Sequence, residues 1–196
     1  MGVTRCLDNL KTLIMKTSKA LMGLALACGL LFTAFGGHHK KSESSVFLTT
    51  FLGNYSGETD KLISLAEAFP ESGIEWRPAE GIRSVREAIL HVATANYFIS
   101  GRFLGAEMPE GMNPREFEKT IKTKDEAIAT LKSSVQFVKD ALSGLDDAAL
   151  AEPIKLFGND TNRMGAVLVV GGHAYEHLGQ LIAYARSSGV TPPWSQ

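Results

Sequence analysis

The chain has 196 residues, of which 44% are hydrophobic and 21% are charged, and its formal net charge is −1. This is the composition of a globular protein, and it excludes an intrinsically disordered chain. Without the first 37 residues, which carry four basic side chains and one acidic side chain, the net charge is −4. A mildly acidic domain without a basic stripe is a poor candidate for nucleic-acid binding.

The first 37 residues have the pattern of a secretory leader. Lys16 and Lys19 precede an apolar run over residues 20–35, and small residues at 34, 36 and 37 offer a cleavage site. The run is short for a membrane span, which needs about 20 apolar residues. We therefore predict an N-terminal extension and signal peptide over residues 1–37, with Met15 as an alternative start, and a secreted or periplasmic mature protein.

Two alternatives for the leader stay open. One is an uncleaved N-terminal anchor, and the other is a lipoprotein attached through Cys28, although the apolar run continues beyond that cysteine. Both cysteines, Cys6 and Cys28, lie in the leader, so the mature chain has no disulfide. We expect a polar linker over residues 38–45, a folded domain over residues 46–196, and no stable membrane association after cleavage of the leader.

Four segments of the folded domain have the apolar periodicity of amphipathic helices. Ser84 and Glu87 form a capping box before the second segment, and Thr123 and Glu126 form one before the third. Asn162 is a suitable cap for the fourth. The expected ranges are 47–69, 84–104, 123–144 and 162–188.

The connections between these segments contain prolines and glycines and no convincing strand. Residues 105–117 read as a long loop, and residues 145–160 as a link with a short turn of helix or an extended piece at residues 152–158. We therefore predict an all-α fold, a four-helix bundle. The loop lengths leave open whether neighbouring helices run up and down or cross over.

Two histidines of the fourth segment lie on one helix face. His173 and His177 are four residues apart, so their imidazoles project from the same side of an α-helix. Val170, Gln180 and Tyr184 continue that side. Two imidazoles at this spacing can hold one metal ion from a single helix, with Gln180 as a weaker candidate for an outer hydrogen bond and Tyr184 as one for core packing.

A third ligand must come from another part of the chain. His91 is the one other histidine after residue 39, and it lies in the second segment on a stripe with Ala88 and Ala95. These small neighbours leave space beside the ring. If the second and fourth helices face each other, His91, His173 and His177 form a site of three nitrogens.

The histidine pair by itself does not establish a metal site. Two histidines on a helix often only bond to core partners or to water. A ferritin-like di-iron site needs paired Glu-x-x-His motifs, which the sequence lacks. A zincin needs Glu directly after the first histidine, where Ala174 stands. Gly171 and Gly172 indicate that another helix approaches closely or that a ligand needs open space.

Two stretches of the sequence together resemble the DinB-like superfamily. They are EWRPAEGIRSVREAILHVATANYF, residues 75–98, and GGHAYEHLGQLIAYARSSGVTPP, residues 171–193. The resemblance covers residues 45–196. It implies a four-helix bundle that binds a divalent metal, typically zinc or nickel, through His91, His173 and His177. Relatives in this family include S-transferases and isomerases that use mycothiol, bacillithiol or glutathione-type thiols.

Three functions remain open from the sequence. The first is a metal-dependent enzyme, thiol S-transferase-like or hydrolase-like, that acts on an unidentified small molecule. The second is a non-catalytic metal-binding or interaction module of the cell envelope, which the absence of an obvious general base favours. The third is a bundle whose histidines hold no metal. A homodimer is compatible with all three, and ordinary imidazoles would lose a metal below about pH 6.

Overall fold

The structure, a computed structural model, describes residues 45–195. The predicted extension and signal peptide, and the linker as far as residue 44, lie outside the described residues. Among the described helices, none is both long and apolar enough to cross a bilayer. The elements are α2 (Val46–Ala68), η1 (Glu71–Gly73), α3 (Val85–Phe103), η2 (Pro114–Glu116), α4 (Phe117–Thr120), α5 (Lys124–Ser143), α6 (Asp147–Ala151), β1 (Pro153–Leu156), β2 (Asn159–Asn162), α7 (Arg163–Ser187) and η3 (Pro193–Ser195).

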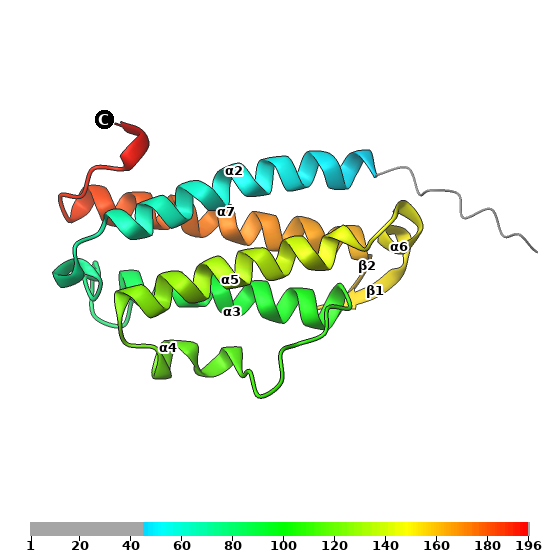
Figure 1. Cartoon of the computed structure of the whole chain (residues 1–196), viewed down its shortest axis with the longest axis horizontal. Helices are drawn as coiled ribbons and strands as arrows, with labels where there is room; N and C mark the ends of the chain where they lie inside the picture. The colour runs from blue at the N-terminus through cyan, green and yellow to red at the C-terminus, as the bar shows by residue number, and fades with distance from the viewer. Residues whose placement is uncertain (1–44, 196) are drawn as a thin grey trace, which may run out of the picture. The chain divides into compact units, whose positions relative to one another are not determined.

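The four long helices form the predicted bundle. Their ranges agree with the expected ones to within a residue or two at each end. Figure 1 shows that α2 and α7 run in one direction and that α3 and α5 run in the other. Helix α7 packs against α2 and α3, and α5 packs against α3 and α2. Two pairs of neighbours are therefore parallel, a topology that loop length alone did not determine.

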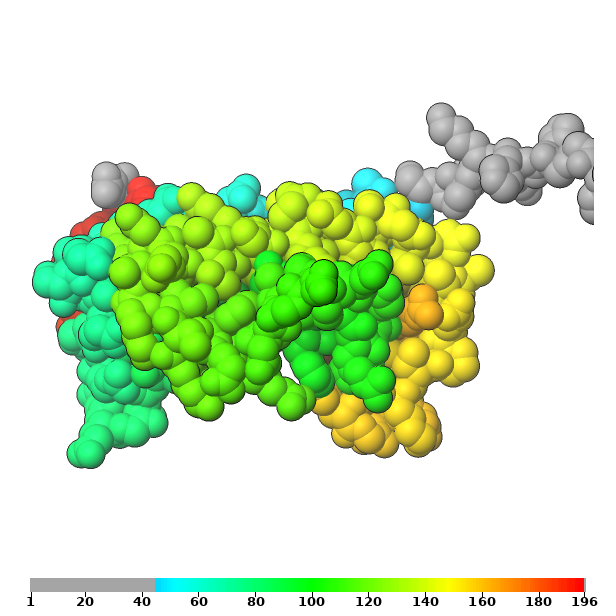
Figure 2. Space-filling view, turned by 60° about the horizontal axis from the view of Figure 1, so that its bottom comes forward, coloured from blue at the N-terminus to red at the C-terminus, as the bar shows by residue number. Residues whose placement is uncertain are grey.

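The parallel pair α3 and α5 requires a connection that returns along the bundle. Residues 104–123 supply it, and they lie across the outside of α3 (Figures 1 and 2). The prediction of a loop over residues 105–117 is wrong at its end, where η2 and α4 form. Asn113 caps this turn by accepting a hydrogen bond from the backbone N–H of Arg115, and Pro114 follows at the first helical position.

The sequence predicts no strand, and this is wrong for residues 153–162. Strands β1 and β2 pair antiparallel, and Leu156 lies opposite Asn159. Between them, Phe157 and Gly158 both have positive φ, 50° and 90°, as a tight two-residue hairpin turn requires. Strands of four residues that are mostly exposed carry little alternation, so the pattern gives no strand signal. The short turn of helix expected in this link is α6, and the extended piece expected at residues 152–158 contains β1.

The core lies where the apolar stripes of the four helices meet. Gly171 confirms the expected close approach, because a Cβ atom there would come within 2.6 Å of the ring of Phe51 on α2. Gly172 faces open space instead. The largest fully buried side chains are Tyr55, Phe69, Leu62, Leu65, Ile89, Leu90, Leu131, Leu142, Leu150 and Leu181.

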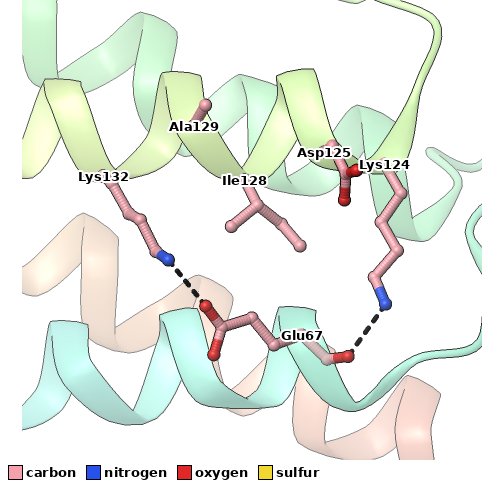
Figure 3. A pocket seen from close by; sticks show the side chains of 6 residues that line it. All are labelled: Glu67, Lys124, Asp125, Ile128, Ala129 and Lys132. Carbon is pink, nitrogen blue, oxygen red and sulfur yellow. Dashed lines mark hydrogen bonds and ion pairs between the residues drawn. The ribbon is translucent and has the colours of Figure 1, made fainter.

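Helix α2 ends against the start of α5. The ammonium of Lys124 donates to the carbonyls of Glu67 and Phe69 at 2.9 and 2.6 Å, which satisfies free carbonyls at the end of α2. Lys132 pairs with the Glu67 carboxylate at 2.7 Å. These side chains line a surface cavity of about 320 Å³ (Figure 3). Because both of its lysines already have partners, we assign this cavity to the packing of the bundle.

The capping box of α3 gives a testable stability prediction. Ser84 Oγ accepts from the N–H of Glu87 at 3.2 Å, and the Glu87 carboxylate accepts from the N–H of Ser84 at 2.8 Å. Ser84→Ala is expected to lower the free energy of unfolding by about 1 kcal/mol, the usual value of an N-cap. Metal content should be unchanged, because Ser84 lies away from the imidazoles.

Chemical denaturation of Ser84→Ala measures this effect. Ser64→Ala is a suitable control, because the Ser64 hydroxyl bonds only to the carbonyl of Lys61 within its own helix. A folded Ser84→Ala protein that lost its metal would show that the cap and the site are not separate.

Candidate metal centre

The structure brings the three predicted histidines together. His91 projects from α3, and His173 and His177 project from α7 onto the same point. The Nε2 atom of His173 lies 3.2 Å from that of His91 and 3.1 Å from that of His177. All three rings are half-buried. Three ring nitrogens thus converge from residues that are 82 positions apart in the chain.

Hydrogen bonds on the far side of its ring orient His177. Its Nδ1 lies 2.6 Å from Gln180 Oε1, and Gln180 Nε2 donates to Tyr184 Oη at 2.8 Å. Tyr184 is buried and packs edge-on against Trp76, with ring centroids 5.3 Å apart. Because an amide oxygen only accepts, Nδ1 carries the hydrogen and Nε2 presents a lone pair to the other histidines.

A carboxylate that the sequence analysis did not identify lies beside His91. Glu118 on α4 places Oε1 3.7 Å from Nδ1 of His91. Arg83 holds this carboxylate, with its Nε 3.1 and 3.2 Å from the two oxygens. Carboxylates in this position beside metal-binding histidines orient the ring and raise its basicity. Glu118 approaches the nitrogen that points away from the Nε2 atoms.

Arg86 is the residue that places Glu118. Its guanidinium is almost fully buried and donates to the carbonyls of Glu118 and Ile121 at 3.1 and 2.8 Å. It also pairs with the Glu75 carboxylate. Arg86 therefore fixes α4, and with it Glu118, over the start of α3. Sequence reasoning missed both residues, and the one available signal was a basic residue, Arg86, on the buried face of a predicted helix.

The spacing of the nitrogens matches the needs of a metal ion. Zinc bonded to imidazole at roughly 2.0–2.1 Å in a tetrahedral site separates two bound nitrogens by about 3.3 Å. Two of the Nε2 separations here, from His173 to His91 and from His173 to His177, are 3.2 and 3.1 Å. In the tautomer with hydrogen on Nδ1, each of these imidazoles offers an Nε2 lone pair to a cation. The donor set therefore fits a divalent ion, and it would leave further coordination positions for a ligand.

Burial keeps two of the imidazoles neutral. It lowers the pKa of His91 from 6.5 to about 4, and electrostatic interaction with Arg83 and His177 adds to this effect. Burial likewise lowers the pKa of His173 to about 4, with further contributions from the neighbouring histidines. A metal ligand must be neutral imidazole, so the site is prepared for a cation at neutral pH. Ordinary imidazoles would lose a metal below about pH 6. Because the pKa values of His91 and His173 are about 4, protons compete with a metal for these two ligands only at lower pH.

These pKa values predict an acid-sensitive metal-free protein. In the unfolded chain His91 and His173 take up protons near pH 6.5, whereas in the folded protein they do so near pH 4. Between these values the unfolded state binds more protons, so the stability of the fold decreases as the pH falls. Histidine NMR titration of the metal-free protein should give two midpoints near 4. Midpoints near 6.5 for both rings would contradict the burial of the site.

Comparisons with known proteins identify the family. A sequence model of the DinB superfamily matches residues 55–181, a range that includes all three histidines. The chain belongs to the DinB superfamily. The resemblance predicted from residues 75–98 and 171–193 is thus confirmed. None of the curated proteins matches the sequence.

Solved DinB-like structures share the fold. A DinB-like protein from Bacillus cereus ATCC 10987 is 17% identical with a TM-score of 0.63, over 73% of this chain and 93% of that one. The DinB-like YjoA of Bacillus subtilis is 20% identical with a TM-score of 0.60, over 75% and 97%. YfiT of Bacillus subtilis is 16% identical with a TM-score of 0.59, over 78% and 93%, and is described as a probable metal-dependent hydrolase with an unusual four-helix bundle topology. At these identities the likeness shows a common fold.

Proposed function

We propose that this DinB superfamily protein is a metal-dependent enzyme that acts on a small molecule. In this proposal His91, His173 and His177 hold one divalent ion, zinc or nickel. The convergence of three Nε2 atoms, with neighbours 3.1–3.2 Å apart, carries the proposal. The fold likeness to YfiT, described as a probable metal-dependent hydrolase, supports it.

The chain's own residues would prepare this site in three ways. When bound, a divalent ion supplies Lewis acidity, which polarises a carbonyl and eases the deprotonation of a water or a thiol. Gln180 and Tyr184 hold the His177 ring in the tautomer whose Nε2 lone pair faces the site. Glu118 offsets the positive charge that His91 gains as a ligand. Three neutral ligands leave the charge of the ion uncompensated.

Hydrolysis and thiol S-transfer are the two reaction classes that this chemistry supports. Both need an activated nucleophile and an electrophile at one cation. Turnover of nitrophenyl acetate, and of an activated aryl halide with a low-molecular-weight thiol, should therefore be measured with zinc-loaded and nickel-loaded protein. We expect turnover of one substrate class, lost in His173→Ala. A metal-loaded protein that turns over neither class would contradict the enzymatic proposal.

A non-catalytic metal-binding module is the second candidate. The position of Glu118 favours it, because this carboxylate approaches Nδ1 of His91 and so lies on the side of the ring away from the Nε2 atoms. In that position it cannot serve as a general base at the cation. A stoichiometric metal without turnover would support this candidate.

We also propose that the protein works outside the cytoplasm. The basic and apolar pattern of residues 1–37 supports export. N-terminal sequencing of secreted or periplasmic material should give a start near Gly37 or His38. A lipid-modified start at Cys28 would replace the signal peptide with a lipoprotein anchor.

A further inference from the structure

The end of α3 and the turn between β1 and β2 lie at the same end of the bundle (Figure 1), and three aromatic rings meet there. Phe98 and Phe103 belong to α3, and Phe157 belongs to the turn between β1 and β2. The centroid of Phe157 lies 6.4 Å from that of Phe98 and 5.5 Å from that of Phe103. We call these three residues the aromatic cluster.

The stability of the fold does not explain the aromatic cluster. Phe157 is 61% exposed and Phe98 is 36% exposed, so much of their apolar surface remains in water. Phe157 is also the one non-glycine residue with positive φ in residues 45–195. Asn and Gly are the residues usual at this turn position, and a bulky side chain rarely adopts this conformation. A strained, exposed aromatic residue of this kind is typical of a binding site.

A positive charge accompanies the rings. The guanidinium of Arg115, which belongs to η2 in the connection across α3, lies 5.9 Å from the centre of the Phe98 ring. Arg115 is exposed, and no ion pair within the described part of the chain involves it. A cation above an aromatic face that has no carboxylate partner is available to an anionic group.

Phe98 of the aromatic cluster lies on the same side of α3 as His91 of the metal centre. Ala95 and Phe98 follow His91 by four and seven residues, which places them on one face of the helix, at about 6 and 10 Å along its axis. Ala95 is small and only partly buried, so it leaves room between the two sites. On α7, Val169 lies one turn before His173 and is 37% exposed. Partly exposed, apolar residues therefore lie along both helices between the histidines and Phe98.

We propose that the aromatic cluster and Arg115 bind the planar apolar end of an elongated, anionic small molecule whose other end reaches the three histidines. The proposal rests on the proposed function for its metal-binding end. It names the substrate class: an aromatic or similarly flat acid joined by a flexible chain to the reacting group. Phe98, Phe157 and Arg115 then determine specificity, and they take no part in the chemistry.

Probes that share a metal-binding head and differ in the tail test this subsite. The probes are acetohydroxamic acid, phenylhexanohydroxamic acid and its para-carboxylate, and binding to the zinc-loaded protein is measured by calorimetry. The phenyl probe should bind about tenfold more tightly than acetohydroxamic acid, as expected for one aromatic contact. The carboxylate should bind more tightly still.

Variants of the aromatic cluster should remove only the contribution of the tail. Phe157→Asn suits the positive φ of the turn and removes the ring, and Phe98→Ala removes its neighbour. In both variants the affinity for the phenyl probe should fall to that for acetohydroxamic acid. The affinity for acetohydroxamic acid itself should stay unchanged. Arg115→Gln should cancel only the gain from the carboxylate. Trp194→Ala, which removes another exposed aromatic residue, is the control and should change nothing.

Phenylhexanoate with metal-free protein separates the subsite from the proposed function. If no zinc-dependent binding of acetohydroxamic acid occurs, the proposed function fails. Binding of phenylhexanoate that Phe157→Asn and Phe98→Ala both weaken would still support the subsite. Equal affinities for acetohydroxamic acid and the phenyl probe, or a preference for the phenyl tail that both variants retain, would overturn it.

Discussion

A His91→Ala variant is expected to lose the bound divalent ion, although it leaves the neighbouring pair His173 and His177 intact. The wild-type protein should hold one ion per chain. Two imidazoles from one helix leave an ion with only two protein ligands, so affinity should fall by more than the 10- to 100-fold that is typical of changes to outer partners. Metal analysis of the purified proteins, after growth with zinc and nickel, measures this.

The remaining histidines of the chain provide the control. His38→Ala combined with His39→Ala removes two histidines of the N-terminal region, and the stoichiometry should stay at one ion. The helical circular dichroism of His91→Ala should match the wild type, because apolar stripes on four helices supply the core. An unchanged metal content in His91→Ala would reduce the site to a local pair on α7.

Arg86→Met is expected to destabilise the fold more than the loss of the Ser84 cap does. Arg86 is 4% exposed, and its guanidinium bonds to the carbonyls of Glu118 and Ile121 and to the carboxylate of Glu75. Methionine keeps the stem of the side chain but leaves these carbonyls without a donor. Glu75 is half exposed and can be solvated, so the cost is mainly that of the carbonyls, about 3 kcal/mol.

Thermal unfolding should show this as a decrease in Tm of roughly 6–12 °C for a domain of this size. Arg102→Met is the matched control on the same helix, because its side chain is exposed, and its effect should stay within about 0.5 kcal/mol. Metal affinity should also weaken in Arg86→Met, since α4 carries Glu118. A Tm equal to that of Arg102→Met would show that Arg86 does not hold α4 in place.

The sequence by itself determined the helices and the shared face of two of the three histidines of the candidate metal centre. Amphipathic periodicity and capping boxes act within a few residues, so the N-caps of α3 and α5, Ser84 and Thr123, could be predicted directly. The spacing of His173 and His177 likewise depends only on the pitch of one helix. These features are local, so they do not depend on how the helices pack.

The tertiary structure decided which elements meet. Sequence spacing cannot show that α3 and α7 are neighbours, so the place of His91 among the ligands rested on its being the one other histidine after residue 39 and on the family resemblance. The parallel pairing of α2 with α7 and of α3 with α5 depends on a connection that crosses the bundle (Figure 1). Loop length alone permits this topology and the up-and-down one.

The residues that surround the metal centre also could not be predicted from the sequence. Glu118 reaches His91 because Arg86 bonds to backbone carbonyls of residues 118 and 121, and every residue has a carbonyl, so no sequence pattern marks the partners. The hairpin turn at Phe157 was missed for a related reason, since Phe is not a residue that signals it. The lowered pKa values of His91 and His173 arise from burial, which exists only once the helices have packed.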